Sequence, residues 1–291
     1  MISLTVLFGL FAALSKTGKS VVVKTAAQAT NEYLTTATMR IITTIILLPL
    51  AVYFGGPNYI DFNTQFWIAV TANTILLGTI GILITKAYKL SDVSLISPLL
   101  GFTPIVTILP TVLLVDDEFT TLGIIGVLLT SIGGFIALSD GNFQKSQFKN
   151  AINDKGVYLI GIVLLIVGFI PPFDKIGVQQ TSPIVWPTVI NLTSGIFVLI
   201  ALSYFQGYNK GTLKKNWKVL LLVSIFHAGI WYGQAAAYEL ANPAYVVSIK
   251  RVSIIFTVLI GNQIYNEENL KWRLIGSSLI VIGVLLLTTA L

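Results

Sequence analysis

Ten apolar runs of about 20 residues follow one another along this chain of 291 residues. Each run is long enough to cross the hydrocarbon core of a bilayer as a helix. In lipid, only helices and closed barrels satisfy every backbone hydrogen bond, and runs of this length are helical. The pattern predicts an all-α polytopic membrane protein with ten transmembrane helices, at 3–23, 33–54, 66–86, 92–114, 120–138, 156–177, 184–205, 217–238, 243–264 and 271–290.

The composition excludes several classes of protein. The chain is 55% hydrophobic and only 10% charged, with a mean hydropathy of +0.85, whereas soluble domains are about 25% charged. There is no cysteine for a disulfide or a thiolate site, and the single histidine excludes any site that needs two. The net charge of +6 is spread over short connections, so we expect a lipid bilayer and no nucleic acid as partner.

The chain repeats itself with an offset of about 150 residues. The segment from Lys24 to Thr30 aligns with the segment from Lys175 to Thr181, and Trp67 aligns with Trp217. We therefore divide the chain into a first five-helix repeat (1–138), a connecting loop (139–155) and a second five-helix repeat (156–291). Because five is odd, the second copy must enter the membrane from the opposite side, which makes the two copies inverted-topology repeats.

The basic residues agree with an inverted repeat. Most of those in connections follow odd-numbered spans, from Lys24 to Arg273, while Lys175 follows an even-numbered one. By the positive-inside rule, the odd connections face the cytoplasm and both termini face outward. We expect a multi-pass protein of the cytoplasmic (inner) membrane.

An ordered set of landmarks runs through the chain. It consists of Lys24 with Arg40, Ser97-Pro98 to Pro104 followed by Asp117-Glu118, and Ser248 to Arg251 followed by Glu267-Glu268, Gly276 and Gly283. This set resembles the EamA family, in the ten-helix branch of the drug/metabolite transporter superfamily, over nearly the whole chain. The resemblance implies a small-metabolite carrier that works by alternating access, with a cavity between the two repeats.

A polar and aromatic stripe marks the eighth span. His227, Trp231, Gln234 and Tyr238 are spaced to share one helix face, and Tyr232 lies beside them. Because such a stripe is costly against lipid, we expect it to face the protein interior and to contact substrate. His227 could also sense or carry a proton.

Basic residues inside spans add further candidates. We expect Lys16 in the first span, and one of Lys250 and Arg251 in the ninth, to contact substrate, since an arginine can clamp a carboxylate bidentately. Arg40 is expected to be a structural partner of Glu32 or of a carbonyl. Four acidic residues are expected near span ends, namely Glu32, Asp92, Asp174 and Glu239.

Proline and glycine mark two spans as hinges or gates. Proline removes a backbone hydrogen bond and kinks a helix, and broken helices at corresponding positions can frame a transport site. The candidates are Pro98, Gly101, Pro104, Pro171 and Pro172. The paired glycines of the fifth and tenth spans, Gly126 with Gly133 and Gly276 with Gly283, are interpreted as close-packing faces.

These features favour a secondary transporter of an amino acid or a related amphoteric or anionic compound. The alternative is a transporter of choline or another cation held in an aromatic cage. An intramembrane enzyme or a channel is more remote, because no paired histidines, mid-span aspartate pair or serine-nucleophile elbow is present. We expect no cofactor and no metal, proton coupling as an open option, a small-molecule substrate and a monomer.

Overall fold

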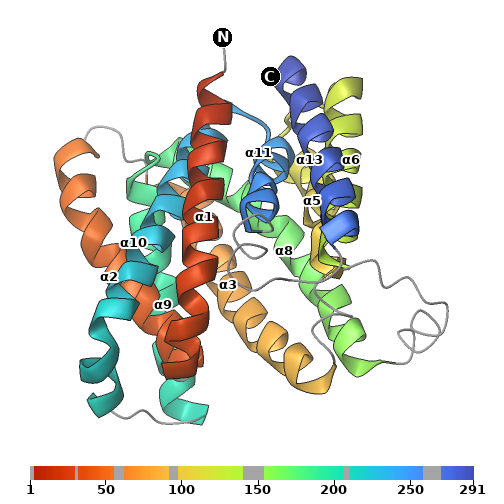
Figure 1. Ribbon diagram of the computed structural model, residues 1–291. Helices are drawn as coiled ribbons and strands as arrows, with labels where there is room; N and C mark the ends of the chain where they lie inside the picture. The colour runs from red at the N-terminus through yellow and green to blue at the C-terminus, as the bar shows by residue number, and fades with distance from the viewer. Residues whose placement is uncertain are drawn as a thin grey trace. The chain divides into compact units, whose positions relative to one another are not determined.

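The computed structural model describes residues 3–29, 32–55, 62–91, 98–139, 154–205, 210–257 and 270–291, and every regular element in these ranges is a helix (Figure 1). Residues 252–257 are also helical. In chain order the elements are α1 (Leu4–Ala29), α2 (Glu32–Phe54), α3 (Thr64–Leu90), η2 (Pro98–Phe102), α5 (Thr103–Leu114), α6 (Thr121–Leu138), α8 (Lys155–Gln180), α9 (Val185–Phe205), α10 (Lys210–Leu240), α11 (Pro243–Ile249) and α13 (Leu270–Ala290).

Within the described ranges, seven helices are long and apolar enough to cross a membrane. They are α1, α2, α6, α8, α9, α10 and α13. A shorter apolar segment, Pro98–Leu114, is formed by η2 and α5. The all-helical, multi-pass membrane class is confirmed, whereas the count of ten crossings and the inverted relation of the repeats stay predictions.

The ninth expected span is broken. We predicted one helix over 243–264, but α11 ends at Ile249 and a turn at 250–251 precedes the helical residues 252–257. The amides of Arg251 and Ile254 each bond the carbonyl three residues back, at 2.9 and 2.8 Å. This tightening to 3₁₀-type bonds interrupts the α-helical ladder. The continuous helix was wrong because hydropathy does not reveal such a break.

The fourth expected span is broken at the matching place. Residues 98–102 form the 3₁₀ helix η2, and α5 begins at Thr103. The Leu100 carbonyl accepts hydrogen bonds from the Thr103 hydroxyl (2.7 Å) and from the Arg251 guanidinium (2.5 Å). Gly101 allows η2 to approach α6, because a Cβ there would lie 2.6 Å from the Phe135 amide nitrogen.

The chain forms two compact units, and each draws helices from both sequence repeats. Unit 1 contains residues 1–10, 79–172 and 241–291, and unit 2 contains residues 11–78 and 173–240. The helices α1, α3 and α8 each contribute residues to both units. The units are therefore not the repeats themselves.

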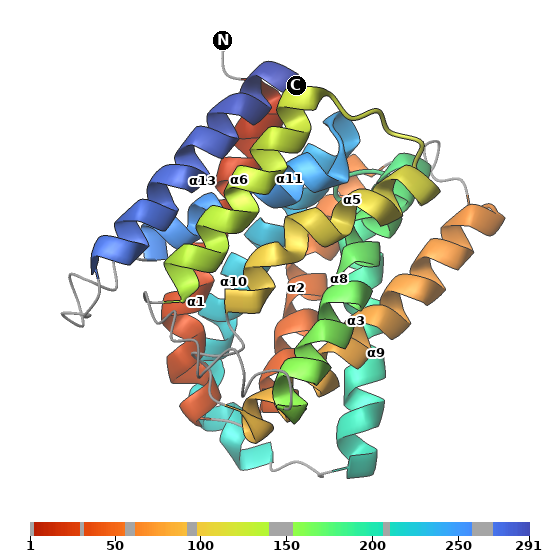
Figure 2. The same ribbon diagram turned by 90° about the vertical axis from the view of Figure 1, so that its right-hand side faces the viewer.

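In unit 1, α6 and α13 lie side by side along their length (Figures 1 and 2). A Cβ on Gly133 would lie 2.6 Å from the Gly276 carbonyl oxygen, and one on Gly126 would lie 2.8 Å from that of Gly283. The predicted close-packing faces are confirmed. Without side chains at these points, the two backbones come into direct contact.

In unit 2, α2 packs against α9 and α10, and an apolar core forms around two buried tryptophans, Trp186 and Trp231. Gly195 keeps α9 close to α2, because a Cβ there would lie 3.2 Å from the Cβ of Arg40. This close packing brings polar side chains of several helices together inside the unit.

Candidate functional site

A buried carboxylate lies at the centre of a polar cluster in unit 2. Asp174, on α8, is 1% exposed. Its Oδ1 accepts hydrogen bonds from Asn73 Nδ2 of α3 at 2.7 Å and from Trp186 Nε1 of α9 at 2.8 Å. Gln234 Nε2 of α10 donates to Oδ2 at 3.5 Å. Hydrogen bonds of this kind make burial of the carboxylate tolerable, because an unsatisfied buried charge is very costly.

The local sequence of α8 places the carboxylate against the indole. The helix continues through Pro171 and Pro172 to Gln180, so Asp174 and Gly177 lie three residues apart on one face. A Cβ on Gly177 would lie 2.1 Å from Trp186 Cε3, so only glycine allows the ring to lie on α8. The indole N–H then reaches Asp174 one turn earlier.

Arg40 brings a positive charge into the same cluster. It projects from α2, is 7% exposed, and donates from Nη1 to the Ser194 hydroxyl of α9 at 2.7 Å. Its Cζ lies 6.0 Å from the ring centroid of Trp231, and it interacts electrostatically with Asp174. Among the described residues, its Nε has no hydrogen-bond partner.

His227 links α10 to α1. Its Nε2 accepts a hydrogen bond from Trp231 Nε1 at 2.9 Å, and its Nδ1 lies 3.2 Å from Lys19 Nζ. The imidazole is 5% exposed, and Lys19 is half-buried. Both neighbours of the ring are therefore nitrogen groups that ordinarily donate.

The predicted stripe of α10 faces the protein interior, as expected. His227, Trp231, Gln234 and Tyr238 are all buried, and Tyr238 is fully so. In the described part of the chain, the Tyr238 hydroxyl has no hydrogen-bond partner. Trp231 donates to His227, and Gln234 donates to Asp174. Contact of the stripe with substrate stays a prediction.

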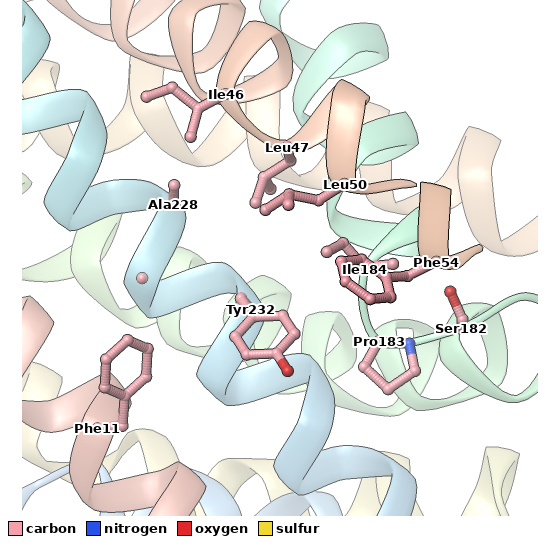
Figure 3. A pocket seen from close by; sticks show the side chains of 11 residues that line it. Phe11, Ile46, Leu47, Leu50, Phe54, Ser182, Pro183, Ile184, Ala228 and Tyr232 are labelled. Atoms are coloured by element: carbon pink, nitrogen blue, oxygen red, sulfur yellow. The ribbon is translucent and has the colours of Figure 1, made fainter. Parts of the chain in front are cut away.

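Tyr232 instead lines a separate apolar pocket of unit 2. The pocket has a volume of about 540 Å³. Figure 3 shows the Tyr232 side chain projecting from α10 toward the part of the pocket that holds Pro183 and Ser182. The remaining lining is almost wholly apolar, from Phe11, Ile46, Leu47, Leu50, Phe54, Ile184, Ala228 and Gly229.

The contacts described for the cluster do not include the other predicted substrate ligands. Lys16 belongs to unit 2 and is half-buried, whereas Lys250 and Arg251 belong to unit 1. The guanidinium of Arg251 donates to the carbonyl of Leu100, which is a structural contact between two broken segments. Substrate contact by these three residues is thus left as a prediction that no contact described here supports.

The predicted hinge residues divide into two groups. Pro98, Gly101 and Pro104 lie where η2 gives way to α5. Pro171 and Pro172 lie inside α8, which the structure keeps helical through both. Whether either pair of prolines acts as a hinge or a gate stays a prediction.

Two charged residues of the cluster were not among the predicted site residues. Asp174 was expected near a span end, and Arg40 was expected to pair with Glu32 or a carbonyl. The structure places Asp174 inside the unit and gives Arg40 a hydroxyl and an aromatic face, while the Glu32 side chain lies outside the described residues. A charge inside an apolar run was the available signal for both. Among the described residues, no three metal-ligating side chains gather in one place.

Comparison with known proteins agrees with this architecture. The model of the EamA-like transporter family matches the chain twice, over residues 3–139 and 154–289. A solved structure titled "Crystal structure of protein" is 14% identical, with a TM-score of 0.76 over 100% of this chain and 98% of its own. At that identity the likeness shows a shared fold alone. No curated protein matches the chain.

Proposed function

Because this chain belongs to the EamA-like transporter family, a family of membrane transporters, we propose that it carries a small amphoteric metabolite, such as an amino acid, across the cytoplasmic membrane. The proposed mechanism is alternating access by a monomer. The transporter class rests on the family, and the choice of substrate rests on the polar cluster of unit 2.

The observation that carries the substrate class is the presence of both charges in one buried cluster. Arg40 and Asp174 interact electrostatically inside the unit, and the ring of Trp231 lies against the guanidinium. Ionisable side chains within spans are expensive and usually mark a substrate or ion pathway. A zwitterion supplies a carboxylate for the cation and an ammonium group for the anion, and its side chain can meet the aromatic face.

The helix breaks support alternating access. The 3₁₀ helix at 98–102 and the turn at 250–251 lie at equivalent positions of the two sequence repeats. Interrupted helices at matching positions of two repeats are a recurring feature of secondary transporters. We therefore assign Pro98, Gly101 and Pro104 to a hinge, and keep Pro171 and Pro172 as a second candidate.

The contacts of His227 support coupling to protons. A neutral imidazole accepts at one nitrogen and donates at the other. Since Nε2 accepts from Trp231, a neutral ring carries its proton on Nδ1, so this N–H and the Lys19 ammonium group face each other as donors. Protonation of the ring would make Nε2 a donor as well and break its contact with Trp231. Lys19 on α1 and Arg40 on α2 are the charged groups that act on the ring.

Replacing His227 by glutamine tests this coupling. His227→Gln keeps a polar side chain but cannot take up a proton, so we expect exchange of substrate to persist while stimulation by an inward pH gradient disappears. The measurement is uptake into proteoliposomes at equal and at unequal pH. An unchanged response to the pH gradient would show that the coupling proton is held elsewhere.

A cationic substrate is the second candidate, and one observation favours it. Asp174 is buried near Trp186 and Tyr238, so an acid is available beside aromatic rings. A quaternary ammonium group fits such surroundings. Against it, the carboxylate already accepts hydrogen bonds from three side chains and shares its cluster with Arg40.

Uptake of labelled compounds into proteoliposomes separates the two candidates. The panel contains amino acids, organic acids and choline. We expect saturable uptake of amino acids. Uptake of choline alone would favour the cationic substrate, and uptake of none of these compounds would contradict both.

A further inference from the structure

Arg40 is a buried cation whose guanidinium is only partly hydrogen-bonded by the described residues. Its Nη1 donates to Ser194, a neutral hydroxyl that itself donates to the Ile190 carbonyl. The residue is only 7% exposed, and among the described residues its Nε has no hydrogen-bond partner. A buried charge is ordinarily paired or fully hydrogen-bonded.

The hydrogen bonds described at Asp174 come from Asn73, Trp186 and Gln234, and its effect on Arg40 is electrostatic. The guanidinium is planar, and its Nε and Nη2 form one edge that can donate two parallel hydrogen bonds. Nη1, which bonds Ser194, lies off that edge.

Arg251 shows how a structural arginine differs. It is equally buried and also has an Nε without a described partner. Its Nη2, however, donates to the Leu100 carbonyl at a helix break, which accounts for its position. Arg40 has no carbonyl partner of this kind in the described ranges, and it lies instead over the ring of Trp231 on the predicted stripe.

We infer that Arg40 binds the carboxylate of the transported metabolite through its Nε edge, with Trp231 holding the guanidinium plane in position. This inference rests on the proposed function and deepens it, because it names the residue that selects a substrate with a carboxylate group. It moves the carboxylate clamp from Lys250 and Arg251 of unit 1 to α2. Bidentate binding of this kind requires the arginine fork, which lysine lacks.

The test compares three compounds that differ at one group: phenylalanine, phenylalaninamide and phenethylamine, which lacks the carboxyl group. Transport and binding are measured with the unchanged protein and with the variants Arg40→Lys and Arg40→Gln. Lys218→Gln is the matched control, because Lys218 is an exposed cation of the same unit that lies over Trp217.

We expect the unchanged protein and the control to prefer phenylalanine to its amide. Both Arg40 variants should bind phenylalanine about ten- to a hundredfold more weakly, as expected for loss of a charged hydrogen bond. Phenethylamine should change by less than about twofold, since it has no group for Arg40. Arg40→Lys keeps the charge and serves as the test where Arg40→Gln does not fold.

Two results would overturn the assignment. One is unchanged affinity for phenylalanine in a folded Arg40 variant. The other is an equal loss for phenylalanine and phenethylamine, which would indicate a purely structural role. If the unchanged protein handles no amphoteric compound, including leucine in a parallel series with leucinamide and isopentylamine, the proposed function itself fails.

Discussion

At the scale of single residues, Asp174 holds the cluster together. Four helices contribute to it, since the carboxylate on α8 accepts hydrogen bonds from α3, α9 and α10. The hydrogen bonds of such a buried network depend on one another, because removal of one group leaves its former partners unsatisfied. The residue therefore serves both the fold of unit 2 and the charge balance of the site.

Two substitutions of Asp174 separate these roles. Asp174→Asn keeps an oxygen for Asn73 and Trp186, so we expect a folded protein whose uptake is reduced at least about tenfold by loss of the charge. Asp174→Ala leaves three buried donors, from Asn73, Trp186 and Gln234, without their acceptor and should cost about 1–3 kcal/mol of stability for each. Thermal unfolding in detergent and uptake in proteoliposomes measure the two effects.

The exposed Glu239 of α10 provides the control, as Glu239→Gln. We expect it to leave both measurements unchanged. Full uptake by a folded Asp174→Asn protein would remove the carboxylate from the transport site.

Sequence reasoning found the stripe of α10 but not its partners. The spacing of His227, Trp231 and Gln234 fixes one face of a helix, and that face is buried. Which side chains lie opposite depends on the packing of other helices. The role of Asp174 was not predicted because its partners come from α3 and α9, which are distant in the sequence.

At the scale of elements, the contact between α6 and α13 is set by glycine. The backbones approach so closely that a Cβ on Gly276 would lie 2.5 Å from the Gly133 carbonyl oxygen. The carbonyl oxygen is a backbone atom and cannot turn aside as a flexible side chain can, so the helices themselves would have to move apart.

Gly133→Leu should therefore destabilise the protein by about 1–3 kcal/mol or more, as overpacking does elsewhere. A lower unfolding temperature in detergent is the expected observation. Gly161→Ala is the matched control, because no atom lies within 4 Å of a Cβ at that position of α8. Equal unfolding temperatures for both variants would contradict the close contact.

The glycine faces could be read from the sequence, but the break in the ninth span could not. Small residues seven apart imply a packing face in any helix. The turn at 250–251 leaves the hydropathy of the segment unchanged, and it is accompanied by a tertiary contact from Arg251 to Leu100. Hydropathy reports burial in lipid and not the continuity of the backbone.

At the scale of the whole molecule, the chain combines its two repeats within each compact unit. Helices from the first and second sequence repeats both contribute to unit 1 and to unit 2. The two repeats could be predicted because the sequence aligns with itself at an offset of about 150 residues. The two units could not be predicted, because they depend on which helices pack together.

The inverted relation of the repeats predicts opposite sides for equivalent positions. The chain has no cysteine, so single cysteines can be placed at Thr64 and at Lys215, which lie about one repeat apart and are both exposed. We expect a membrane-impermeant maleimide to label Thr64→Cys in intact cells, and Lys215→Cys only after permeabilisation. Labelling of both from the same side would contradict the inverted topology.

Counterflow in proteoliposomes tests the central claim most directly. Vesicles loaded with an unlabelled amino acid are placed in a trace of the same labelled compound, with the Asp174→Asn protein as reference. A carrier of amphoteric metabolites predicts transient accumulation of label that saturates and that the reference lacks. Uptake that is linear in concentration and indifferent to the internal amino acid would contradict a carrier and indicate a channel.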